Sequence, residues 1–138
     1  MLELAEENFE VNSNLRQVTR YDFETVVDVL GNPIRRQIIR KLSEGPDYAL
    51  RISNELNVSQ QLASKHLNVI RNAELVDVIR QKSHKGADKK MFSLNKFYSL
   101  QIDFSPSLYN ERLISFNNPR LWINTDNYID RLEDQVKN

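Results

Sequence analysis

The chain has 138 residues, 19 of them basic and 19 acidic, with 3 glycines and no cysteine. This length is enough to bury a core without a metal or disulfide, and the lack of cysteine excludes a thiolate zinc finger and a cysteine nucleophile. So few glycines leave no glycine-rich phosphate-binding loop. With no apolar run near the roughly 20 residues of a membrane span and an acidic start unlike a signal peptide, we expect a cytoplasmic protein without a membrane partner.

Charge is divided unevenly along the chain, although the formal net charge is zero. Residues 1–30 carry a net charge of −5, residues 31–96 a net charge of +7, and residues 97–138 a net charge of −2. A basic middle segment between acidic ends is typical of a protein that binds a polyanion. The alternative is that the charges only solvate separate faces of the protein.

The first half of the chain predicts four helices. Residues 1–20 form an acidic lead-in without periodicity, and the first helix follows from residue 21 to residue 30. The second helix begins at Asn32 and Pro33 and ends before Gly45-Pro46. Asp47 is expected to cap a short third helix, and Ser59 a fourth helix over residues 60–73. The predicted inward residues of the first three helices are Phe23, Val26, Val27 and Leu30, then Ile34, Ile38, Ile39 and Leu42, then Ala49, Ile52 and Leu56.

The fourth helix has one apolar and one polar face. Ala63, Leu67 and Ile70 form the predicted buried stripe. The polar face has no acid and is rich in side chains that hydrogen-bond base edges in a major groove. The alternative is an ordinary solvated helix face. The residues that we expect to reach bases or flanking phosphates are Gln60, Gln61, Ser64, Lys65 and Asn68.

After Leu75 the apolar period changes from 3.6 toward 2, which predicts a β-hairpin over residues 76–94. Its tip is long and basic, so we expect it to follow a phosphate backbone, with Arg80 able to enter a minor groove. The alternative is a flexible, solubilising loop. The predicted contacts are Arg80, Lys82, Lys85, Lys89 and Lys90.

The last part of the chain is less regular. Residues 97–104 alternate and are predicted to be extended, Ser105-Pro106 interrupts them, and residues 107–118 fit a strand or a helix. A helical stripe returns from Pro119 to Val136. We expect it to form a dimer interface, and the alternative is that it covers the core of the monomer. The expected interface residues are Leu121, Trp122, Tyr128, Ile129, Leu132 and Val136.

Helix, helix, short helix, polar-faced helix and basic hairpin form the order of a winged helix-turn-helix. Residues 30–39, LGNPIRRQII, resemble the L-A/G-N/D-P-x-R-x-x-I-L/I opening of the ArsR-like transcriptional regulators. Residues 56–67, LNVSQQLASKHL, and residues 70–76, IRNAELV, are similar to two further motifs of that family. The resemblance covers about residues 30–95. The turn at residues 105–109 is similar to that of archaeal members.

The resemblance implies a mainly α fold with a small β-wing (α+β). It places a winged helix-turn-helix domain at residues 21–96 and a C-terminal extension with the dimerisation helix at residues 97–138. Glu74 stands where the family usually has glycine. A left-handed backbone at this position costs a non-glycine residue about 1 kcal/mol, so we expect a different entry into the wing. Tyr48 stands where the family often has Ser or Thr, which favours Asp47 as the cap. The ligands of the metal-sensing members are missing, so we expect no metal and no cofactor.

Other side chains are candidates for weaker roles. For Arg35 and Arg36 the alternative to a phosphate contact is solvation of the helix surface, and for His66 it is packing. No constellation of nucleophile, base and acid stands out, so we expect no enzyme. The candidate phosphate contacts are Arg35, Arg36, Arg51, Ser59 and His66.

Together these patterns predict a sequence-specific transcriptional regulator that binds double-stranded DNA. We expect a homodimeric repressor on a palindromic operator, because a two-fold dimer reads two half-sites about one helical turn apart. Two alternatives stay open. A non-specific, chromatin-type DNA binder would need little from Gln60, Gln61 and Asn68, and a winged-helix protein-interaction module would carry apolar residues on these faces.

Overall fold

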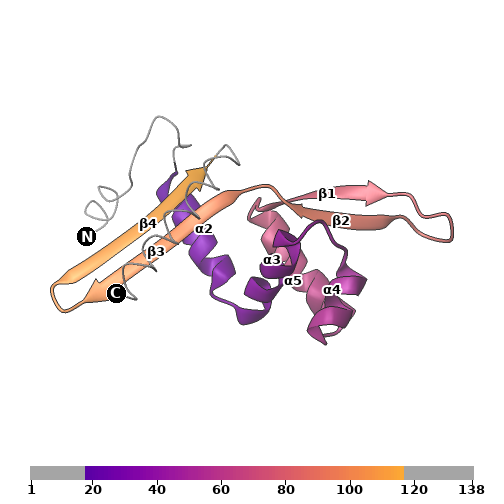
Figure 1. Cartoon of the computed structure of the whole chain (residues 1–138), viewed down its shortest axis with the longest axis horizontal. Helices are drawn as coiled ribbons and strands as arrows, with labels where there is room; N and C mark the ends of the chain where they lie inside the picture. Colours follow the sequence, from indigo (N-terminus) through magenta and orange to yellow (C-terminus); the bar gives the residue numbers. More distant parts are fainter. Residues whose placement is uncertain (1–17, 117–138) are drawn as a thin grey trace, which may run out of the picture. The chain divides into compact units, whose positions relative to one another are not determined.

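The computed structural model describes residues 18–116. Its helices are α2 (Arg20–Leu30), α3 (Pro33–Ser43), α4 (Ala49–Leu56) and α5 (Gln60–Asn72), and its strands are β1 (Val76–Gln81), β2 (Lys89–Leu94), β3 (Phe97–Ser105) and β4 (Leu108–Phe116) (Figure 1). The chain forms two compact units. The helical unit spans Glu24–Asn95, and the hairpin unit contains the first turn of α2 and the β3–β4 hairpin. None of the described helices is long and apolar enough to cross a membrane.

Two helices begin at the caps that the sequence predicts. The Asn32 side chain accepts hydrogen bonds from the backbone N–H groups of Ile34 at 2.9 Å and Arg35 at 3.1 Å, and Pro33 is the first residue of α3. The Ser59 hydroxyl accepts from the backbone N–H of Leu62 at 3.1 Å at the start of α5. Each cap satisfies N–H groups that have no partner inside the helix. Both predictions are confirmed.

The start of α4 differs from the prediction. Its N-cap residue is Tyr48, whose side chain makes no capping hydrogen bond. Asp47 is buried one residue earlier, and its carboxylate accepts from the backbone N–H of Tyr48 at 2.8 Å. The backbone of Asp47 also pairs with Phe92 of β2 through N···O distances of 3.1 and 2.7 Å. The prediction that Asp47 caps α4 is therefore wrong, because a long-range strand contact holds this residue outside the helix.

The entry from α5 into β1 keeps the backbone of a glycine terminator although the residue is Glu74. Glu74 has a φ of 61°, in the left-handed region. Its N–H donates to the Arg71 carbonyl at 2.9 Å, and the N–H of Leu75 donates to the Ile70 carbonyl at 3.4 Å. These two bonds form a Schellman ending, and Leu75 and Ile70 are both buried. The expectation of a different entry is wrong, because the buried Leu75 and the helix carbonyls hold Glu74 in this conformation.

The left-handed backbone of Glu74 leads to a prediction about the stability of the fold. The variant Glu74→Gly is expected to be more stable than Glu74→Ala by about 0.5–1 kcal/mol, because the left-handed penalty of a Cβ exceeds the extra freedom of glycine in the unfolded chain. Both variants remove the same carboxylate, so the alanine variant is the matched control. Urea unfolding of the two proteins measures the difference, and equal or reversed stabilities would contradict the assignment of strain to this backbone.

Each of the four described helices carries a buried apolar stripe. Ala63, Leu67 and Ile70 of α5 are fully buried, as predicted. In α3 and α4, the buried apolar residues are Ile38, Leu42 and Ile52, while the other predicted inward residues Ile34, Ile39, Ala49 and Leu56 are half-buried. In α2 the structure corrects the stripe: Phe23, Val26 and Val29 are buried, whereas Val27 and Leu30 are half-buried. The predicted stripe and the observed stripe of α2 both fit a helical period, and tertiary packing selects between them.

The β1–β2 hairpin, the wing, has the predicted antiparallel pairing, with Val76 opposite Leu94 and Gln81 opposite Lys89. Lys89 and Lys90 were expected in the tip but belong to β2, because their backbones pair with Gln81 and Arg80. With four helices followed by this hairpin, the predicted α+β winged helix-turn-helix fold is confirmed. In Figure 1 the wing extends away from α3, α4 and α5.

The β3–β4 hairpin resolves the segment that fitted either a strand or a helix. Residues 108–116 form β4, antiparallel to β3, and the chain turns at Ser107 with a φ of 71°. Glu111 is buried, and it accepts hydrogen bonds from Arg20 at 2.5 Å and the Tyr109 hydroxyl at 2.6 Å. Burial raises the pKa of Glu111, but these two bonds outweigh it and hold the pKa below its usual value. The predicted dimerisation helix and most of the acidic lead-in lie outside the described residues.

Candidate nucleic-acid interface

The polar face of α5 gathers all the residues that the sequence predicts for base recognition. They line one open hollow on the protein surface, and no Asp or Glu occurs in the helix. Ser64 is half-buried and the other four are exposed. The opposite stripe, fully buried in the helical unit, fixes the rotation of the helix. The residues of the hollow are Gln60, Gln61, Ser64, Lys65 and Asn68.

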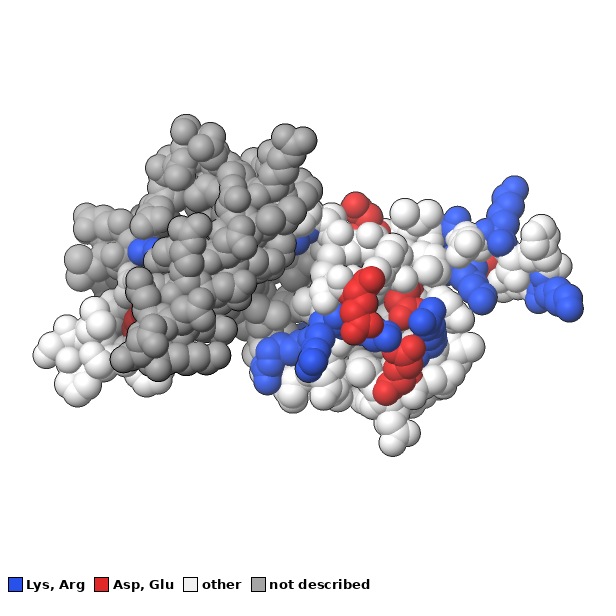
Figure 2. Space-filling model, in the orientation of Figure 1, with Lys and Arg blue, Asp and Glu red and all other residues white. Residues whose placement is uncertain are grey.

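The wing carries the second group of predicted residues. Arg80, Lys82, Lys85, Lys89 and Lys90 are all exposed. Figure 2 shows basic side chains gathered toward the free end of the wing. Arg80 and Lys90 stand directly opposite each other across the ladder. Like charges at opposed positions destabilise a sheet, so an anionic partner would relieve this repulsion.

A groove of about 560 Å³ joins the α5 face to the wing. It is lined by Gln60, Ser64 and Asn68, which also line the α5 hollow, and by the wing residues Lys89 and Lys90. The recognition face and the wing therefore border one continuous surface depression. Arg80, Lys82 and Lys85 do not line it.

Sequence reasoning missed several contributors to the groove, among them Tyr48 and Leu50 at the start of α4. The ring of Tyr48 lies beneath the Lys89 ammonium, at 4.5 Å from the ring centroid. No local pattern predicts this contact, because the partners belong to elements far apart in the chain. The family pattern indicated only that a tyrosine replaced a capping residue.

Two candidate phosphate contacts are engaged at the end of α2. The Arg35 guanidinium donates to the carbonyls of Val29 at 2.8 Å and Asp28 at 2.9 Å, and the Arg36 guanidinium donates to the carbonyl of Leu30. These carbonyls lie in the last turn of α2, where no backbone donor inside the helix reaches them. The two arginines therefore join α3 to the end of α2.

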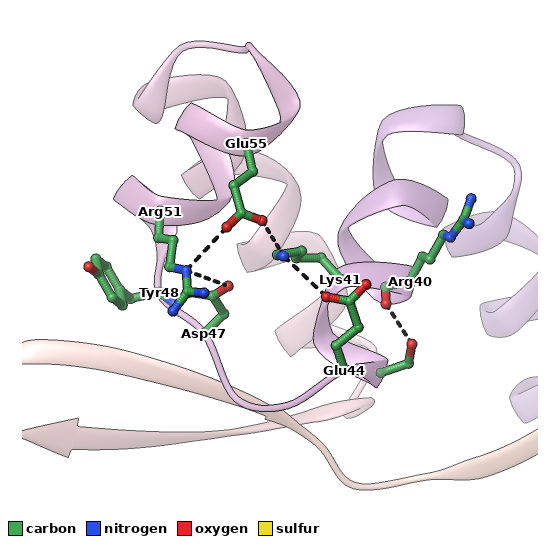
Figure 3. Close-up of polar contacts among 8 residues, drawn as sticks. Arg40, Lys41, Glu44, Asp47, Tyr48, Arg51 and Glu55 are labelled. Carbon is green, nitrogen blue, oxygen red and sulfur yellow. Dashed lines mark hydrogen bonds and ion pairs between the residues drawn. The ribbon is translucent and has the colours of Figure 1, made fainter.

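Arg51 belongs to a charge network that connects α3 to α4 (Figure 3). Its Nε lies 3.2 Å from the Glu55 carboxylate and 3.8 Å from Asp47. Lys41 of α3 pairs with Glu55 and also with Glu44, at 3.1 Å. The hydrogen bond from Lys41 lowers the pKa of Glu55, and the bond from Arg51 adds to this effect. Two carboxylates thus balance the charge of Arg51 in the absence of DNA.

For His66 the structure favours packing in the core, which was the alternative to a phosphate contact. The side chain is buried on α5, and its Nδ1 has no hydrogen-bond partner in the described part of the chain. Burial lowers the pKa of the imidazole, and the charges of Arg35 and Lys65 lower it further. Burial and a lowered pKa favour the packing alternative over a phosphate contact for this side chain.

The lowered pKa of His66 predicts a loss of stability on mild acidification. As the pH falls from about 7.5 to about 5.5, the unfolded chain takes up a proton near pH 6.5, whereas the folded chain resists it, so the free energy of unfolding decreases. The variant His66→Gln is expected to flatten this dependence. Urea unfolding at several pH values measures it, with His84→Gln at the exposed wing tip as the control that keeps the slope. An unchanged slope in His66→Gln would refute the prediction.

Comparison with known proteins identifies the helical segment. Residues 32–78 match the family model described as bacterial regulatory protein, arsR family. This segment belongs to the arsR family. The ArsR-family segment comprises α3, α4, α5 and the start of β1. The family consists of transcriptional regulators rather than enzymes, so this part of the chain is the DNA-binding domain of an ArsR-family transcriptional regulator.

Solved structures that are similar to this chain include two regulators. The transcriptional repressor BigR from Xylella fastidiosa is 21% identical, with 56% of this chain and 82% of that chain covered and a TM-score of 0.44. The ArsR family transcriptional regulator RHA00566 is 11% identical, with 85% of this chain and 98% of that chain covered and a TM-score of 0.46. The curated proteins contain no match.

Proposed function

We propose that the chain is a sequence-specific transcriptional regulator in which α5 lies in the major groove and the wing follows the adjacent backbone. The observation that carries this proposal is the continuous depression shared by the acid-free α5 face and the β2 side of the wing. An α-helix fits the major groove, where each base pair presents a distinct pattern of donors and acceptors. A protein-interaction module would be expected to carry apolar residues on this face of α5, which the hollow lacks.

The side chains of α5 suggest a division of roles. Gln60, Gln61 and Asn68 have the amide geometry that pairs with adenine through two hydrogen bonds, and Lys65 suits guanine or a phosphate. Ser64 is short and half-buried, so it serves bases that approach the helix closely. The Ser59 hydroxyl oxygen already caps α5 by accepting from the backbone N–H of Leu62. A phosphate contact of Ser59 would therefore use the hydroxyl as a donor.

The wing supplies the part of the affinity that depends on salt. Lys82 and Lys85 in the tip would contact phosphates, and Arg80 would enter a minor groove. Lys89 and Lys90, which line the groove beside α5, would contact the strand nearest that helix. Neutralised phosphates release counterions, so each such contact steepens the salt dependence.

We further propose a homodimer that represses by occupying a palindromic operator. One domain of this size covers only a few base pairs, and two-fold symmetry doubles the site. The interface proposed from the sequence, around Trp122 and Leu132, lies outside the described residues. Occupancy of a promoter is sufficient for repression and requires no further surface.

A selection from random DNA duplexes tests this function, with the enriched duplexes titrated at two salt concentrations. A two-fold symmetric motif that competes far better than bulk DNA would support a dimeric, specific regulator. Salt-sensitive binding without a motif would replace the proposal with a chromatin-type DNA binder. No binding at low salt would refute both, and would favour the protein-interaction module.

A further inference from the structure

The contact between Tyr48 and Lys89 brings together the two elements that border the groove. Tyr48 is the N-cap residue of α4, and Lys89 is the first residue of β2. The Lys89 Nζ lies 4.5 Å from the centre of the Tyr48 ring, within the range of a cation–π interaction. We propose that Tyr48 is a positioning residue for the wing, whose ring holds the Lys89 ammonium at the groove wall to meet a DNA phosphate. This proposal rests on the proposed function.

The backbone explains why this contact forms. Asp47 forms a single antiparallel bridge with Phe92, so the residue before Tyr48 is held beside β2. Phe92 and Asp47 are both buried, which anchors the pairing. Because the pairing is antiparallel, the chain runs from Asp47 into α4 in the direction in which β2 leads back toward Lys89. Tyr48 is thereby fixed beside β2, within reach of Lys89.

The side chains around the contact favour an anionic ligand. The charged side chains that line the groove are three basic ones, Arg71, Lys89 and Lys90, and one acidic one, Asp88. In the described residues, Lys82 and Lys85 of the tip contact no aromatic ring. A free lysine loses much rotamer freedom when it binds, so a lysine already ordered by a ring binds a phosphate at a smaller entropic cost.

Affinity for a duplex of about 30 base pairs of unselected sequence tests the proposal, because phosphate contacts do not need an operator. Tyr48→Leu is expected to weaken binding about two- to five-fold. Tyr48→Phe keeps the ring and is expected to bind the duplex as tightly as the wild type. In a Lys89→Met background, Tyr48→Leu is expected to have no further effect. In a Lys82→Met background, the matched control, it should have its full effect. Equal effects in both backgrounds, or no effect in the wild type, would overturn the positioning role.

A second measurement separates this inference from the proposed function. In the protein without DNA, the ε-methylene protons of Lys89 should resonate upfield of those of Lys82, because they lie over the Tyr48 ring, and Tyr48→Leu should remove the shift. An absent shift would overturn the inference whatever the protein binds. A shift in a protein that binds no duplex would instead refute the proposed function, and the role of the contact with it. If Tyr48→Leu does not fold, Tyr48→Thr removes the ring while supplying a good helix cap.

Discussion

Alanine at Gln61 or Asn68 is expected to weaken binding to a selected operator by about 1–3 kcal/mol each, and to leave binding to unselected DNA nearly unchanged. Both side chains are exposed on the acid-free face of α5 and line its hollow. An amide that makes two hydrogen bonds to one base contributes to discrimination between bases, whereas backbone contacts are the same on every sequence. The specificity ratio should therefore fall together with the operator affinity.

Fluorescence anisotropy with operator and unselected duplexes, at one salt concentration, measures both affinities. Gln37→Ala is the matched control, because Gln37 is exposed on α3 and lines neither the α5 hollow nor the groove. It should change neither affinity. Equal losses on both duplexes would assign Gln61 and Asn68 to phosphate contacts and would support the chromatin-type DNA binder. No loss on either duplex would remove these residues from the interface.

Leu67→Ala is expected to lower the free energy of unfolding by about 2–5 kcal/mol, because it leaves a cavity in a closely packed core. Leu67 is 0% exposed, in the middle of the α5 stripe between Ala63 and Ile70. Domains of this kind are commonly stable by only about 5–15 kcal/mol, so the loss is a large share of the total. Since the same stripe fixes the rotation of α5, DNA binding should also weaken near the new unfolding midpoint.

Urea unfolding followed by circular dichroism measures the loss. Leu50→Ala is the control, since it removes the same atoms from a side chain that is 48% exposed. Its effect on stability should be well below that of Leu67→Ala. Similar losses in the two variants would mean that the α5 stripe does not form the core of the helical unit.

The helices could be predicted because their signals are local. Asn32 and Ser59 lie within three residues of the N–H groups that they cap, and the stripe of Ala63, Leu67 and Ile70 repeats at the period of one helix. The acid-free face of α5 follows from that stripe, because a helix with one buried side exposes the other. The hairpin followed from alternation and a polar tip. These signals predicted both the winged fold and the residues of the α5 hollow.

Other details depend on packing between elements. Arg35 and Arg36 donate to carbonyls of the preceding helix, six or seven residues back, and His66 is enclosed by packing that its own helix does not determine. In α2, Val29 is buried in place of Leu30, since two neighbouring stripes satisfy the same period. Local propensity ranks such alternatives weakly, and burial against the rest of the unit selects one of them.

By itself, the sequence determined the order of the elements, the caps of α3 and α5, the acid-free face and the basic hairpin, because each depends on neighbours within one or two helical turns. Only the tertiary structure decided that Asp47 pairs with Phe92, that Glu74 adopts a left-handed backbone, and that Tyr48 lies under Lys89. Each of these features balances a local cost, such as a lost cap or a strained φ, against burial or pairing with a distant segment. That balance depends on which segments meet in space, and the local pattern does not contain it.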